Sequence, residues 1–231
     1  MWIIDFGDRE HDAAALFISP FEYVKKHVKP DRENNNRARR RNYWWQHGET
    51  MPGLRKHVKV LSRFVCTPRV SKPRVFIWVS HSTLPDSRVY AFARDDDYFF
   101  GVLHSRIHEI WSLTTSSRHG VAGDIVYNNT TCFETFPFPW PLGQESVDDA
   151  RVIAIGHAAT NLVDLRKKLK TTASRYDTLT KMYNEKPEAL MIAHRKLDEA
   201  VFAAYGWPSD LSEDEILARL LALNLEWANR G

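Results

Sequence analysis

The sequence predicts an α+β protein, with a mixed β-sheet and packed helices over residues 1–145 and a small all-α domain over residues 146–231. Short runs rich in β-branched and aromatic residues, at 70–80 and 89–93, favour strands in the first part. From Ser146 onward the composition becomes helical, and apolar residues recur at helical spacing. With 231 residues, 43% of them hydrophobic, the chain can bury a full core.

The first 64 residues predict one strand followed by helices. Residues 2–6 (Trp-Ile-Ile-Asp-Phe) are typical of a strand, and because a lone strand needs a neighbour, we expect the chain to be a piece of a longer protein. A helix is expected from Asp12 to just before Pro20, and a further turn is expected to end at Pro30. Residues 51–64 predict an amphipathic helix with Pro52 near its first position.

The stretch 101–141 is the expected reading surface of the molecule. Residues 101–111 have the apolar spacing of one helix, and 114–123 are small and polar, which predicts an exposed loop. Residues 125–127 favour a short strand, and 133–141 alternate aromatics with prolines that exclude a helix or a central strand. Polar side chains on a loop held between rigid pieces are well placed to contact a ligand.

Three amphipathic helices are predicted at the C-terminal end, forming a bundle or a lid on the sheet. The first and third open with capping boxes, and the second stops at a glycine. They cover Ser146 (with Asp149) to about Lys170, Glu188 to Tyr205 before Gly206, and Ser212 (with Glu215) through Trp227.

The net charge of +3 is unevenly distributed, and one segment of the chain is strongly basic. Residues 25–74 contain 15 Lys and Arg against three acidic residues, a net of +12, which favours a polyanionic partner. Within this block, residues 31–42 are interpreted either as a solvated surface or as a segment that contacts phosphates. The adjacent Tyr43, Trp44 and Trp45 could anchor the segment to the core or stack on bases, and we favour core anchoring for the tryptophans. The candidate phosphate contacts are Arg37, Arg39, Arg40, Arg41, Arg55, Lys72 and Arg74.

Catalytic and metal-binding motifs are missing from the sequence. It contains no GxGxxG, Walker, GxSxG or HExxH pattern, and Cys66 and Cys132 are isolated, so no catalytic or metal-ligating residue is assigned. His104 and His108 share a predicted helix face but lack the zincin glutamate, and the acids 95–97 are expected to form a turn or helix cap. No stretch predicts a membrane span or a secretion signal, which indicates a cytoplasmic protein.

Several motifs resemble the target recognition domain of MmeI-like DNA methyltransferases, the fused restriction-modification enzymes and their phage-defence relatives. They are Asp-Ile-Val-Tyr-Asn-Asn at 124–129, Phe-Pro-x-Pro-Trp-Pro at 136–141 and Gly-Val-Leu-x-Ser-x-x-His-x-x-Trp at 101–111. Shorter matches lie at 3–7, 28–30, 44–45 and 70–72. The helical end, with Asn184, His194, Leu197, Asp198 and the segment 204–207, is similar to the C-terminal domain of the same enzymes.

The resemblance implies a module that recognises a sequence in double-stranded DNA. Its base-reading positions correspond here to Ser116, Ser117, Arg118 and Gly120, with a second set at Ser87 and Arg88. Gly120 departs from relatives that carry a long side chain there, which leaves one base position without that contact. Tyr127, Asn128 and Asn129 are expected to be structural, because constant residues cannot set differing specificities.

The same resemblance implies that catalysis takes place elsewhere. In such enzymes a preceding domain binds S-adenosylmethionine and methylates adenine at N6, so this chain is expected to need no cofactor itself and to work with a methyltransferase domain supplied upstream or in trans. Three other interpretations stay open: a protein-interaction module that docks a partner through the helical end, a truncated remnant without DNA reading, and a metal hydrolase that uses His104 and His108.

Overall fold

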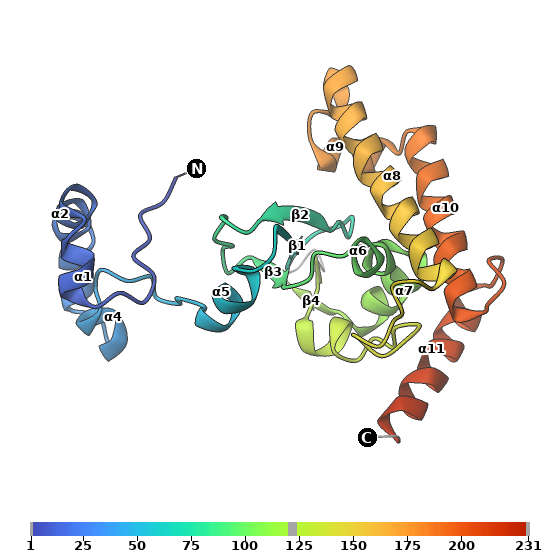
Figure 1. Cartoon of the computed structure of the whole chain (residues 1–231), viewed down its shortest axis with the longest axis horizontal. Coiled ribbons are helices and arrows are strands. Elements are labelled where there is room, and N and C mark those ends of the chain that lie inside the picture. Colours follow the sequence, from blue (N-terminus) through green and yellow to red (C-terminus); the bar gives the residue numbers. More distant parts are fainter. Residues whose placement is uncertain (1, 120–123, 230–231) are drawn as a thin grey trace. The chain divides into compact units, whose positions relative to one another are not determined.

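The computed structural model describes residues 2–119 and 124–229 of the chain. The chain divides into two compact units, Met1–His57 and Val58–Gly231, and each is described here by itself. Figure 1 labels most of the elements of both units. None of the described helices is long and apolar enough to cross a membrane.

The first unit is built from short helices around a small aromatic core. The helices are α1 (His11–Ala15), α2 (Ile18–His27), α3 (Lys29–Glu33), α4 (Ala38–Asn42) and α5 (Pro52–Val58), the last of which ends at the boundary between units. Phe6, Phe21, Trp44 and Trp45 form the core, which confirms the predicted anchoring role of the two tryptophans. The Trp45 indole Nε1 also donates to the carbonyl of Arg9 at 2.8 Å.

Three predictions for the N-terminal region are wrong. Residues 2–6 form no strand; there the carboxylate of Asp5 accepts two hydrogen bonds from Arg55, at 2.8 and 3.1 Å. Pro20 and Pro30 do not end helices but lie inside the first turns of α2 and α3. Proline is tolerated there because the first N–H groups of a helix have no intrahelical acceptor, so the helix loses no hydrogen bond. The helix expected over 51–64 ends at Val58, since the residues from Arg63 onward pair as a strand.

The second unit contains a three-stranded antiparallel sheet in the order β2-β1-β3. The strands are β1 (Arg63–Pro68), β2 (Ile77–Ser80) and β3 (Val89–Phe92), and the central strand buries Phe64, Val65, Cys66 and Thr67 in succession. The predicted strand 70–80 therefore forms only over its last four residues. Burial raises the pKa of the Cys66 thiol to about 12, so this cysteine behaves as an apolar core residue.

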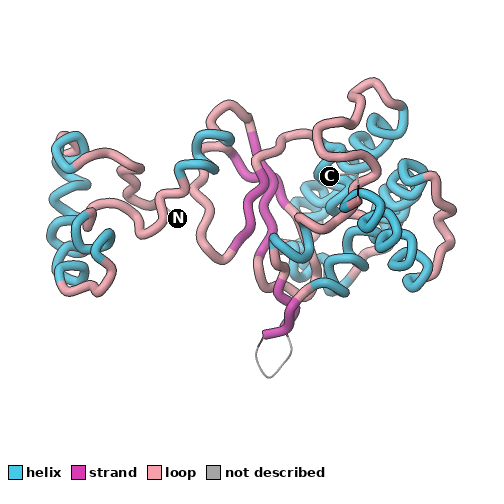
Figure 2. Tube along the Cα trace, turned by 90° about the horizontal axis from the view of Figure 1, so that it is seen from below, coloured by secondary structure: helices cyan, strands magenta, loops and turns pink. Residues whose placement is uncertain are grey.

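Part of the loop predicted over 114–123 forms a strand, and residues 120–123 of that prediction lie outside the described residues. Strands β4 (Ser117–His119) and β5 (Asp124–Val126) pair antiparallel, with Arg118 opposite Ile125. The residues of β4 are exposed, as the sequence indicated, but they belong to a strand. Figure 2 shows this hairpin at one end of the three-stranded sheet.

Two helices replace the single one predicted over 101–111. Helix α6 (Asp97–His104) ends where Ser105 takes an extended conformation, and Ser105 then caps α7 (Arg106–Thr115) by accepting a hydrogen bond from the His108 N–H. Asp96 caps α6 in the same manner through the Phe99 N–H, which confirms the predicted cap in the acidic segment. A π-helical turn, Asn129–Phe133, follows β5.

The C-terminal end is helical, as predicted. It comprises α8 (Ala150–Thr172), a 3-10 turn (Ser174–Tyr176), α9 (Leu179–Glu185), α10 (Glu188–Tyr205) and α11 (Glu213–Ala228). The bounds of α10 and the capping box of α11 confirm the sequence analysis, with Gly206 at φ 69° ending α10. Helix α9 was not anticipated, and α8 is capped by Asp149, not by a box that starts at Ser146.

One hydrophobic core runs through the second unit and joins the sheet to the C-terminal helices. Helix α6 lies between them, and it packs against α8 and α10 (Figure 1). Gly101 of α6 is the point of closest approach: a Cβ there would lie 2.6 Å from Ile155 and 3.2 Å from Leu197. The absence of a side chain at Gly101 therefore permits the helices to pack at this distance.

Replacing Gly101 with alanine should destabilise the second unit by about 1–3 kcal/mol, because the new methyl group overlaps Ile155. Gly156→Ala is the matched control, since a Cβ in this α8 position would have its nearest neighbour at an ordinary 3.7 Å. That variant should gain about 0.5–1 kcal/mol of helix stability. Urea unfolding measures both, and a G101A variant as stable as the parent would contradict this packing.

Candidate nucleic-acid interface

The two predicted base-reading segments come together around Arg69, the residue that follows β1. Its backbone N–H donates to the carbonyl of Arg88 at 2.8 Å, and its own carbonyl accepts from the Tyr127 N–H at 2.8 Å. A bridge between Val70 and Val126 extends this contact. The turn before β3 and the β4–β5 hairpin, about thirty positions apart in the chain, are thus tied to one stretch of backbone.

A groove of about 600 Å³ lies between these segments. Four of the residues predicted to read bases line it, together with two that the sequence analysis missed. The set comprises Ser87, Arg88, Ser117 and Arg118, and in addition Arg69 and His119. Among the described residues, the groove walls carry three arginines and no carboxylate, so the electrostatic character of the groove suits an anionic ligand. The basic block had contained Arg69, but no local signal singled it out.

The side chains of the groove differ in their freedom to bind a ligand. The Arg118 side chain has no hydrogen bond or ion pair within the part of the chain that the structure describes, and it is exposed. Arg88 instead pairs with the carboxylate of Asp86 at 2.9 Å. The Ser116 hydroxyl donates to the Leu113 carbonyl, and Gly120 lies outside the described residues.

Arg74 lies buried beside the groove. Its Nη1 donates to Thr67 Oγ1 at 3.1 Å and to the Pro68 carbonyl, and its guanidinium lies 4.8 Å from the ring centre of Tyr127. Arg74 is 8% exposed, and burial lowers the pKa of its guanidinium. Its contacts are within the protein, so we leave Arg74 out of the proposed phosphate contacts.

Four of the remaining basic candidates are exposed, and two, Arg40 and Arg55, are half-buried. In the first unit Arg37, Arg39 and Arg41 are exposed, and Arg40 is half-buried. The guanidinium of Arg55, in contrast, forms a two-point ion pair with Asp5. In the second unit the Lys72 side chain is exposed, and no partner for it lies among the described residues.

His104 and His108 have structural partners. The Nε2 of His104 lies 2.7 Å from the carbonyl oxygen of Phe76, while His108 donates from Nδ1 to Leu103 and accepts at Nε2 from the Tyr127 hydroxyl. Desolvation lowers the pKa of both imidazoles, that of His108 to about 3. Among the described residues no group of three His, Cys, Asp or Glu side chains could hold a metal ion.

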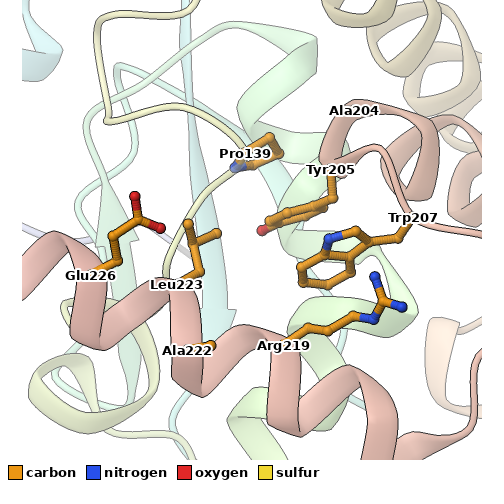
Figure 3. A pocket seen from close by; sticks show the side chains of 8 residues that line it. All are labelled: Pro139, Ala204, Tyr205, Trp207, Arg219, Ala222, Leu223 and Glu226. Carbon is orange, nitrogen blue, oxygen red and sulfur yellow. The ribbon is translucent and has the colours of Figure 1, made fainter.

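A separate recess of about 340 Å³ lies at the helical end, between the end of α10 and α11 (Figure 3). The rings of Tyr205 and Trp207 stack with 4.5 Å between centroids, and Arg219 lies over Trp207. The Tyr205 hydroxyl donates to the Pro137 carbonyl at 2.7 Å. The segment 204–207 that carries part of the resemblance thus holds the proline-rich segment against the helices.

Comparisons with known proteins identify the class of this module. The family description "MmeI, target recognition domain" matches residues 2–140, and "MmeI, C-terminal domain" matches residues 147–230. DNA methyltransferase A of Bacillus subtilis (strain 168) is 30% identical over 150 residues, which are 64% of this chain and 16% of that protein. The fold resembles the Type IIL restriction-modification enzyme MmeI, solved in complex with DNA, with a TM-score of 0.77, 18% identity and coverage of 99% of this chain and 29% of that one.

These findings define a target recognition module of the restriction-modification class. The chain belongs to the MmeI family, and it comprises that family's target recognition domain followed by its C-terminal domain. It spans less than a third of either relative's length. The resemblance found in the sequence motifs is thereby confirmed.

Replacing Arg74 with methionine should destabilise the second unit by about 1–3 kcal/mol, because the buried Thr67 hydroxyl and the Pro68 carbonyl both lose their donor. Lys72→Met, an exposed cation two residues away, should stay within about 0.5 kcal/mol of the parent. Urea unfolding of both variants distinguishes the roles. Equal stability of the two variants would contradict the structural assignment of Arg74.

Proposed function

We propose that this chain recognises a specific sequence in double-stranded DNA through the groove around Arg69. The supporting observation is that Arg69 joins the turn bearing Ser87 and Arg88 to the hairpin bearing Ser117 and Arg118. A two-stranded ribbon such as β4–β5 is narrow enough to enter the major groove of B-DNA, which is about 12 Å wide. Membership of a restriction-modification family supports a cytoplasmic location, where the protein meets its DNA.

Each groove residue has a chemical role in this proposal. Arg118, whose side chain has no partner among the described residues, donates a bidentate pair of hydrogen bonds to a guanine edge. Ser116 and Ser117 donate to or accept from base edges. Arg88 is released from Asp86 when it contacts a base, and Arg69 and His119 add contacts to bases or phosphates. Gly120 retains its place in the reading set as a position without a side chain.

The exposed cations contact phosphates in this proposal. Arg37, Arg39, Arg40 and Arg41 of the first unit, together with Lys72, supply charge that orients the module on the duplex without reading sequence. Arg55 can join them only if it leaves Asp5, which makes its contribution the smallest.

Methyl transfer is assigned to a part of the longer proteins that this chain does not include. The residues described here do not fit an S-adenosylmethionine site, because β1, β2 and β3 are antiparallel. Cofactors of this kind bind at the carboxyl ends of parallel strands beside a glycine-rich turn. We therefore derive no catalytic step from this chain, and we propose that a methyltransferase domain or subunit completes the enzyme.

Arg118→Ala should weaken binding to the preferred duplex by about 1–3 kcal/mol and relax one base position, because it removes a bidentate contact. The preferred sequence is first obtained by selection from randomised duplexes, and affinities are then measured by fluorescence anisotropy. Arg195→Ala, an exposed arginine of α10 outside the groove, is the control. An equal loss on every sequence would show that Arg118 contacts phosphate only.

Changing Arg39, Arg40 and Arg41 together to glutamine should lower the salt dependence of duplex binding, with about 0.9 lost from the slope of log K against log salt per phosphate contact. Base preference should stay the same. The control changes Lys168, Arg195 and Lys196, three exposed cations of the helical end, and so removes the same charge. If both triple variants shift the slope equally, the three arginines make no specific contact with the duplex.

A further inference from the structure

The second unit contains another polar pocket, which is separate from the base-reading groove. It encloses about 670 Å³ between the segment before β2 and helices α7, α9 and α10, and the two pockets share no lining residue. Four residues that carry the family resemblance but have no part in base reading line it: Lys72, Asn184, His194 and Asp198. Residues from both family domains therefore converge on one site.

Positive charge exceeds negative charge in this pocket. Lys72, Arg74, Arg106 and Lys186 line it, against Glu109 and Asp198. Burial raises the pKa of both carboxyl groups, that of Asp198 to about 6. Asp198 is also partly engaged, because it accepts a hydrogen bond from the Arg106 N–H at 2.7 Å. With four basic residues against two acidic ones, the electrostatic potential of the pocket favours an anion.

Arg166 of α8 lies directly behind the pocket as a buried cation. It is 6% exposed, and its guanidinium contacts the Phe76 carbonyl, the His104 ring and the Tyr183 hydroxyl. Within the described part of the chain no carboxylate lies within 4.0 Å of it, and its Nε has no hydrogen-bond partner. A buried cation without a counter-ion is costly, and an anion in the adjacent pocket would offset that cost.

The wall between Arg166 and the pocket is made of neutral polar groups. His104 and Tyr183 both contact Arg166 and line the pocket, and the Tyr183 hydroxyl lies 2.8 Å from Nε2 of His194. Desolvation and the charge of Arg166 lower the pKa of His194 to about 4, so this imidazole is uncharged at neutral pH. Arg74, which is also nine-tenths buried, lines the same pocket with an unpaired Nη2.

Lys186 is held in an unusual backbone conformation at the rim. It has φ 48° and ends α9 in the left-handed region, which is uncommon for a residue with a side chain. Such conformations cost free energy and persist where the surroundings impose them, frequently at ligand sites. Lys186 is among the residues that line the pocket.

We propose that this pocket binds the phosphate of a nucleotide, with Lys72, Arg106 and Lys186 contacting the phosphate oxygens. The apolar residues Leu103, Leu190 and Met191 supply a surface for the sugar or base. The volume is within the range of small-ligand sites, and it exceeds what an inorganic anion alone requires. The nucleotide is either free or part of a DNA strand, and the two sources share the same recognition chemistry.

The test titrates the full chain with dAMP by calorimetry and, separately, measures the salt dependence of binding to a random-sequence duplex. Lys72→Ala and Lys186→Asn remove one charge each, and asparagine tolerates the left-handed backbone of position 186. Lys196→Ala, an exposed lysine of α10 outside the pocket, is the matched control. Arg118→Ala separates this site from base reading, because it should leave dAMP binding unchanged.

A free nucleotide as ligand is indicated when dAMP binds the parent and binds about tenfold or more weakly to each pocket variant but not to the control. A strand phosphate is indicated when dAMP does not bind but the pocket variants lower the salt slope by about 0.9 each and the control does not. The proposal is overturned if neither measurement separates the pocket variants from Lys196→Ala. Because Arg118→Ala tests the groove alone, failure of one proposal leaves the other standing.

Discussion

A buried chain of polar contacts connects the groove surface to the helical core, and the packing of the second unit depends on these contacts. Arg74 bonds the end of β1 and packs on the ring of Tyr127, whose hydroxyl donates to His108, which in turn donates to the last turn of α6. Every member is buried, so a missing link would leave an unpaired polar group in the interior. This requirement fixes the position of Tyr127, and with it the start of the segment that follows the hairpin.

The same chain explains why residues of one type have different roles here. Arg69, Arg74 and Arg118 all belong to the β1 and hairpin region, yet their side chains differ. Arg74 is buried and donates to the Thr67 hydroxyl and the Pro68 carbonyl, while the exposed Arg118 side chain has no partner among the described residues. An enclosed guanidinium organises the backbone around it, and an exposed one remains available to a ligand. Composition alone placed Arg69 and Arg74 in the same basic block and did not distinguish their roles.

Features set by local chemistry could be predicted from the sequence. The start of α11 at Ser212 and the end of α10 at Gly206 are specified within a single turn of chain, and they were found. The break at Ser105 was missed because its apolar neighbours continue the helical spacing, although a serine three positions before the bonded His108 N–H is a capping signal. Residues 2–6 read as a strand, but no partner strand pairs with them in the part of the chain that the structure describes, and the ion pair of Asp5 with Arg55 ties this segment to α5 instead.

The candidate site was predictable as a list of residues but not as a surface. Family motifs gave Ser87, Arg88, Ser117 and Arg118, whereas their meeting point depends on backbone bonds made by Arg69, about twenty to sixty positions away in the chain. Such long-range pairing leaves no periodic signal, since the hydrogen bonds involve main-chain groups that every residue has. The exposed strand β4 illustrates the consequence: its polar sequence is that of a loop, and pairing with β5 gives it a fixed register. A fixed register sets the spacing of the side chains that face a ligand, so a paired strand can present Arg118 more reproducibly than a free loop.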